Sequence, residues 1–250
     1  MKLDHIGIVG HRIEELATMF EAGGFTVTPL ARHAGGRTGN RCVMLRDGGY
    51  LELISTIDGG TSATLDRFLA RHVGAHILAL GIDAETDIRN RLQLAFGSVP
   101  EPSRTDRAVD DADPDGPRAR FTLLTPPDRP EGRVHLIHHE TPEALWQPRF
   151  LNHANRAVSL EEVAIVSAEP AATAAWYSRL AGRPLTPDPA GGYALALQRG
   201  WIRIVPPGAY PAPSLPSIAA LTLLTDGAPE VRMNLGGVAI AFKNASSRAS

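Results

Sequence analysis

Histidine is the residue type in this chain with the widest chemical scope, and its distribution is uneven. All nine histidines lie at or before His153, and the residues after it contain none. A neutral imidazole binds divalent metals, and imidazoles also carry protons near neutral pH. Chemistry based on histidine is therefore expected in the first part of the chain.

Two short apolar segments place ionisable groups at strand spacing. Side chains alternate between the two faces of a strand, so Glu52 points to the face opposite its two leucine neighbours. In the segment VHLIHH, His135 and His139 share one face and His138 takes the other. A one-residue shift of register would exchange these faces.

Other common catalytic arrangements are missing from the sequence. Cys42 lies in a predicted strand beside no activating base, so we interpret it as a packing residue. The segment GGRTG at 35–39 lacks the ending and the strand-loop-helix order of a phosphate loop. No serine lies in a Gly-x-Ser-x-Gly elbow.

Composition places the chain among globular proteins. It has 250 residues, of which 43% are hydrophobic and 21% charged, and its net charge is −2. This charge predicts no partnership with nucleic acid or an anionic membrane, and no apolar run approaches the roughly 20 residues of a membrane span. The single cysteine and the opening MKLDHIGIVG favour a reduced, cytoplasmic protein.

The chain repeats a β-α-β-β-β pattern. A strand at 3–9 precedes an amphipathic helix, and FTVTP, RCVMLRD and YLELIS then have strand character. Three blocks recur in order: LDHIGIVG as LEEVAIVS from 160, GFTVTP as GRPLTP from 182, and GGYLELI as RGWIRIV from 199. Glycine and proline, 24 and 20 residues, suit turns between many short strands.

Two weaker copies fill the remaining chain. One has a strand at 74–83, a helix at 85–96 and the strands RFTLLT and RVHLIHHE; the other is truncated, with a strand at 217–226, a short helix APEVRMNL and a strand at 237–244. The acidic segment 104–117 is predicted to be an exposed loop, and 206–216 a stiff connector.

These segments resemble the vicinal oxygen chelate superfamily, in particular its glyoxalase-like branch. The likeness rests on LDHIGIV, on YLELIS, on HAGGRTGNRCVML and on HHETPEALWQPRFLNHANRA. It implies an α+β fold in which tandem βαβββ units pair into two cupped mixed sheets, as in dihydroxybiphenyl dioxygenase. We expect an N-terminal domain at 1–157 that holds the ligand cup, and a degenerate, truncated one at 158–250.

The resemblance also implies a divalent metal held by the first and last strands of each unit. Carried over to this chain, the ligands are His5, Glu52, His76 and a histidine of VHLIHH. The alignment of EGRVHLI on GGYLELI favours His135, and a register slip would select His138 instead. Imidazole and carboxylate ligands suit Fe, Mn, Zn, Ni or Co. The alternative is that each histidine is a hydrogen-bonded core residue and that no metal binds.

Further groups around the cup are predicted to orient a substrate, and Glu52 is also a candidate catalytic proton carrier. A structural alternative exists for each of these groups, as a turn or packing residue. The substrate-orienting candidates are His33, Thr38, Asn40, Trp146 and His153.

The C-terminal copy has Glu162 at the position of His5 and Arg203 at that of Glu52. Because a cation at a ligand position repels a metal, we predict no metal there and an ion pair between these two residues. The leading functional prediction is a metal-dependent lyase, isomerase or ring-cleaving dioxygenase acting on a small oxygenated molecule. The alternatives are a metal-free protein that binds small molecules and an interaction scaffold; a homodimer is compatible with all three.

Overall fold

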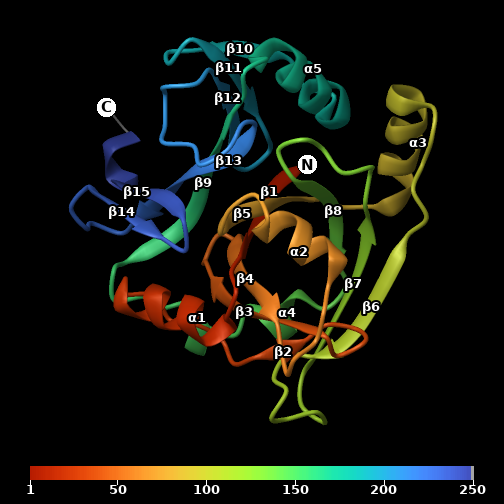
Figure 1. Ribbon diagram of the computed structural model, residues 1–250, viewed down its shortest axis with the longest axis vertical. Helices are drawn as coiled ribbons and strands as arrows, with labels where there is room; N and C mark the ends of the chain where they lie inside the picture. The colour runs from red at the N-terminus through yellow and green to blue at the C-terminus, as the bar shows by residue number, and fades with distance from the viewer. Residues whose placement is uncertain (249–250) are drawn as a thin grey trace.

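A computed structural model describes residues 1–248, and its strands form one mixed sheet of 15 strands within that range (Figure 1). The sheet is built from four consecutive units, three of which begin with a strand followed by a helix. This α+β architecture of paired units confirms the predicted fold class.

The first unit places its first and last strands side by side. β1 and β4 are parallel, and β3 and β2 continue the sheet outward from β4. A short helix, α2, follows this unit. The elements are β1 (Lys2–Val9), α1 (Ile13–Ala22), β2 (Ala31–Arg32), β3 (Thr38–Met44), β4 (Tyr50–Thr56) and α2 (Ala63–Leu69).

The second unit has the same strand arrangement. β5 and β8 are parallel, β7 and β6 lie beyond β8, and β5 pairs antiparallel with β1, which joins the two units. We call the hollow face of β1–β8 the N-terminal cup. The elements are β5 (Gly74–Gly81), α3 (Glu85–Phe96), β6 (Ser103–Ala108), β7 (Arg118–Leu124), β8 (Arg133–His139), α4 (Pro142–Leu145) and a 3-10 turn at Pro148–Phe150.

The last two units pair in the same way, and we call the face of β9–β15 that corresponds to the N-terminal cup the second cup. β9 pairs parallel with β12 and antiparallel with β13, and β13 pairs parallel with β15. Within residues 1–248, the fourth unit has three strands and no α-helix. The elements are β9 (Ala157–Val166), α5 (Pro170–Ala181), β10 (Leu185–Asp188), β11 (Gly192–Ala196), β12 (Trp201–Val205), β13 (Ser217–Thr225), β14 (Val231–Leu235), β15 (Val238–Asn244) and a 3-10 turn at Ala245–Arg248.

Three local predictions are wrong. The segment 25–29 is not a strand, because the Thr28 hydroxyl accepts the Cys42 amide hydrogen bond at 2.8 Å in place of a regular strand ladder. β6 overlaps the first part of the predicted loop 104–117, because its polar residues pair with β7 at an exposed edge. The predicted helix APEVRMNL contains strand β14, which is held by pairing with β15.

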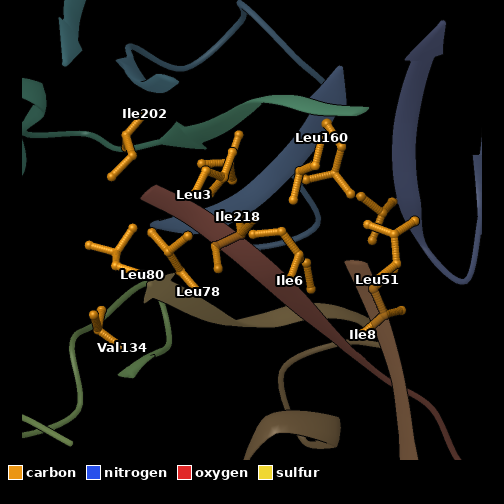
Figure 2. Packing of buried hydrophobic residues seen from close by; sticks show 14 of the residues in the cluster. Leu3, Ile6, Ile8, Leu51, Leu78, Leu80, Val134, Leu160, Ile202 and Ile218 are labelled. Carbon is orange, nitrogen blue, oxygen red and sulfur yellow. The ribbon is translucent and has the colours of Figure 1, made fainter. Parts of the chain in front are cut away.

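The two halves share one hydrophobic core. β5 is buried along its whole length, and Leu78 and Leu80 meet Leu3 and Ile6 of β1 and Ile218 of β13 (Figure 2). Buried side chains of α1, α3 and α5 pack into the same cluster. The core therefore fixes the central strands from the side opposite the N-terminal cup. Among the described residues, no helix is long and apolar enough to cross a membrane.

Substitution of a central core residue should reveal this dependence. Leu78→Ala is expected to lower the free energy of unfolding by about 3 kcal/mol, because a fully buried side chain leaves a cavity. Leu94→Ala is the control, since Leu94 is 89% exposed, and it should change stability by less than about 0.5 kcal/mol. Urea unfolding of both variants measures the difference; equal effects would contradict the assignment of the core.

Candidate functional site

A cavity of about 340 Å³ occupies the N-terminal cup. Both units line it, and Leu65 of α2 forms part of its wall. Its volume lies at the lower end of the range for small-molecule pockets. The polar side chains in its wall are His5, His33, Thr38, Tyr50, Glu52, Ser62, Thr64, Thr105, Arg107, Arg133 and His135, and the apolar ones include Met44, Ile54, Ile77, Phe121 and Leu145.

The register of the parallel pairs relates the two units. Gly7 of β1 lies opposite Glu52 of β4, and Ala79 of β5 lies opposite His135 of β8. Glu52 and His135 therefore hold equivalent positions. Two residues earlier on the first strands, the counterpart of His5 is Ile77.

The prediction that His76 is a metal ligand is wrong, because this register places Ile77 at the position that corresponds to His5. His76 is fully buried away from the cavity, stacks on Phe68 at 4.9 Å and contacts the His72 carbonyl oxygen through Nε2 at 2.8 Å. The sequence alignment of β5 was displaced by one residue, which moved the chosen side chain to the other face of the strand. Burial lowers the pKa of His76.

Glu52 is the centre of the polar cluster in the cavity. Asn40 donates a hydrogen bond from Nδ2 to Glu52 Oε1 at 2.5 Å, His33 Nε2 lies 3.5 Å from the same oxygen, and His5 Nε2 lies 3.6 Å from Oε2. Burial would raise the pKa of Glu52, but His33, His5 and Asn40 together hold it well below its ordinary value. Glu52 is therefore ionised at neutral pH.

His5 is fixed by its neighbour in the sequence. A bulge in the pairing of β1 with β5 separates Leu3 from His5 and allows the buried Asp4 carboxylate to reach His5 Nδ1 at 2.8 Å. Tyr50 stacks on the His5 ring, with 4.3 Å between centroids. The Asp4 contact turns Nε2 of His5 toward Glu52.

Asp4 also contacts a second histidine. His139 Nε2 lies 3.2 Å from the same Asp4 oxygen that His5 approaches. Burial would raise the pKa of Asp4, but the hydrogen bonds from His139 and His5 lower it to about 2. Asp4 is thus an ionised, buried carboxylate held between two imidazoles.

His135, and not His138, faces the cavity. Thr125 Oγ1 is hydrogen-bonded to His135 Nδ1 at 2.8 Å, and Nε2 has no hydrogen-bond partner within residues 1–248. Burial, aided by the charge of His5, lowers the pKa of His135 to about 4, so the ring is neutral at pH 7. His138 lies outside the cavity, with Nδ1 3.2 Å from the Ile82 carbonyl oxygen.

The predicted substrate-orienting residues divide into two groups. His33 and Thr38 line the cavity, and His33 Nδ1 lies 2.9 Å from Thr38 Oγ1. Asn40 does not line the cavity but donates a hydrogen bond to Glu52. His153 instead holds the backbone of Thr26 and Met44 together. Trp146 packs edge-on against Tyr50 and His139. The structure does not bring these last two residues to the cavity.

Several polar residues of the site were not selected from the sequence, among them Asp4, Tyr50, Arg107 and Arg133. Asp4 could have been found from its position beside His5 in a predicted strand. Arg107 could not, because the segment around it is polar and was assigned to a loop. Burial also raises the pKa of Tyr50 well above its ordinary value, so this cavity residue is a neutral phenol.

The second cup contains ion pairs at the corresponding positions. Arg203 binds both Asp188 oxygens at 2.6 and 2.8 Å and lies 4.0 Å from Glu162, whose other cationic neighbour is Lys243 at 3.6 Å. The predicted pairing of Glu162 with Arg203 is confirmed at the limit of contact, although Asp188 is the main partner.

As the side chains stand, the part of the chain described here contains no group of three histidine, cysteine or carboxylate residues that could hold a metal ion. In the N-terminal cup, the ligand types are nevertheless those of a site with two imidazoles and one carboxylate: His5, His135 and Glu52.

The family model of the glyoxalase-like domain matches residues 3–181. The chain therefore belongs to the glyoxalase-like family, within the vicinal oxygen chelate superfamily. None of the curated proteins compared with the chain matches it significantly.

Solved structures share the fold at low sequence identity. A hypothetical protein from Staphylococcus aureus has a TM-score of 0.76 at 15% identity and covers 97% of this chain and 98% of its own. A mutant of 4-hydroxymandelate synthase from Streptomyces coelicolor has a TM-score of 0.61 at 16% identity, and the match covers 90% of this chain and 71% of that chain. The 2,2',3-trihydroxybiphenyl 1,2-dioxygenase of Sphingomonas wittichii has a TM-score of 0.53 at 12% identity, and the match covers 96% of this chain and 89% of that chain.

The ionised Asp4 predicts a specific pH dependence of stability. Its folded pKa of about 2 lies below the ordinary 3.8, so it contributes stability that is present above pH 3.8 and is lost as the pH falls through about 2. Asp4→Asn should therefore be less stable than wild type at pH 6 by about 2 kcal/mol, and the gap should narrow on acidification. Urea unfolding at pH 6, 4 and 3 measures it. Glu15→Gln, at an exposed ion pair, is the control; a gap for Asp4→Asn that does not change with pH would refute the assignment.

Proposed function

We propose that the protein is a metal-dependent enzyme that acts on a small oxygenated organic molecule in the N-terminal cup. Its divalent ion would be held by His5, Glu52 and His135. The reaction belongs to the lyase, isomerase or ring-cleaving dioxygenase types found on this fold. The division of the chain into a ligand-binding part at 1–157 and a degenerate part at 158–250 belongs to the same proposal.

One contact carries this proposal. His5 Nε2 and Glu52 Oε2 lie 3.6 Å apart, and His5 donates its Nδ1 proton to Asp4. An imidazole lone pair that faces an ionised carboxylate is repulsive unless a cation lies between them or near them. Either a second proton on His5 or a bound metal ion meets this requirement. The carboxylate partner of Nδ1 is also the usual outer-shell support of a metal-bound histidine.

The donor set fits a divalent ion in its chemistry, and a bound ion would supply polarisation of adjacent substrate oxygens. The residues of the chain supply the rest. Asp4 fixes the tautomer of His5, and Thr125 holds the ring of His135. Glu52 is ionised and can accept a proton at Oε2, while Asn40 restrains Oε1. Leu65 and Leu145 restrict water at the apolar wall.

A second function is favoured by a different observation. Both Glu52 oxygens already have polar neighbours, and no three metal-binding side chains within residues 1–248 are assembled for an ion. A metal-free protein that binds small molecules would keep this arrangement, with His5 doubly protonated between Asp4 and Glu52.

Cobalt titration separates the two functions. The metal-dependent enzyme should bind one equivalent of Co²⁺ with visible absorption bands, and His5→Ala, Glu52→Gln and His135→Ala should each weaken binding by about 100-fold or more, because each removes one of three ligands. His138→Ala is the matched control, since His138 is an adjacent histidine outside the cavity, and it should bind Co²⁺ as wild type does.

Nitrogen-15 NMR of the His5 ring gives the complementary measurement. Lack of Co²⁺ binding by the folded wild type, together with protons on both His5 ring nitrogens at pH 7, would reject the enzyme and leave the metal-free binding protein.

A further inference from the structure

Arg107 is a cation in the cavity wall that lacks an anionic partner. It lies on β6, and its Nε atom is buried with no hydrogen-bond partner. Its Nη1 donates to the adjacent Ala108 carbonyl oxygen at 3.2 Å, and its Nη2 donates a long bond of 3.5 Å to Asn40 Oδ1. No carboxylate within residues 1–248 pairs with it.

The other arginine of the cavity differs in this respect. Arg133 donates to both oxygens of Asp128, at 2.8 and 3.1 Å, so its charge is already compensated. A partly buried guanidinium without such a partner is costly, because desolvation is not offset by a counter-charge. An arginine that lines a cavity and has no carboxylate partner therefore favours the binding of an anion from solution.

Asn40 lies between Arg107 and the Glu52 carboxylate. It donates to Glu52 through Nδ2 and accepts from Arg107 through Oδ1, so it stands between the two charges. The cavity is consequently polarised, with a carboxylate and imidazoles in one part and a guanidinium in another. Apolar walls from Phe121, Met44 and Leu145 complete it.

We infer that the substrate is a small organic carboxylate, whose anionic group pairs with Arg107 while its reacting oxygen faces His5, Glu52 and His135. A planar guanidinium matches a carboxylate with two parallel hydrogen bonds. The inference rests on the proposed function for the reacting end of the molecule. The anion subsite itself depends only on Arg107.

Binding measurements with matched probes test the subsite. Isothermal titration would compare benzoate, phenylacetate and 4-hydroxybenzoate with their neutral amides. Wild type should bind at least one carboxylate about 10-fold more tightly than its amide, the range expected for a charge-assisted hydrogen bond. Arg107→Gln should abolish this preference and leave amide binding unchanged.

Arg104→Gln is the matched control, because Arg104 lies on the same strand, is exposed and does not line the cavity. It should bind the probes as wild type does. Wild type that binds no carboxylate of the set, or that prefers the amides, would overturn the inference, as would an unchanged preference in folded Arg107→Gln.

Co²⁺ titration of the same variants keeps the two proposals apart. Arg107→Gln should retain one equivalent of Co²⁺, because Arg107 is no ligand. A wild type that binds the carboxylate through Arg107 but binds no Co²⁺ would reject the metal-dependent function and support the anion subsite. One that binds Co²⁺ while its carboxylate binding is independent of Arg107 would reject the subsite alone.

Discussion

The register of two parallel strand pairs, β1 with β4 and β5 with β8, determines which side chains face the N-terminal cup. Side chains alternate along a strand, so a shift of one residue would exchange the cavity face for the core face. The core locks this register from behind, because β1 and β5 are buried along nearly their whole length. Glu52 and His135 are brought into one cavity by this constraint, and Ile77 rather than a histidine occupies the position related to His5.

Buried charge is the second organising feature of the cup. Asp4 is buried and Glu52 is 12% exposed at its side chain, and both remain ionised, because imidazoles surround each of them. His5 lies between the two carboxylates and connects them. Burial keeps His135 neutral, which is the form that binds metal. In the second cup, Arg203 and Lys243 supply the positive charge in place of imidazoles.

The repeated βαβββ pattern was sufficient to predict the fold, because strand-helix-strand order and matching blocks survive in the sequence of both halves. Alternation placed Glu52 on the face that lines the cavity, and the alignment of EGRVHLI on GGYLELI selected His135 over His138, which lies outside the cavity. It failed for His76, because β5 is buried on both faces and its apolar sequence carries no alternation that fixes the register. Arg107 was missed because pairing with β7, and not local sequence, makes a strand of a polar segment. The helix α2, which contributes Leu65 to the cavity wall, was likewise not predicted.

We propose that the N-terminal cup, and not the corresponding face of residues 158–250, holds a cation between His5, Glu52 and His135. Anomalous diffraction from crystals grown with Co²⁺ tests it most directly. We predict one strong peak within ligand distance of His5 Nε2, a Glu52 oxygen and His135 Nε2, and none beside Glu162 and Asp188. A peak only at surface residues, or a Co²⁺-soaked cup in which His5 and Glu52 keep their present contact without an ion, would contradict the account.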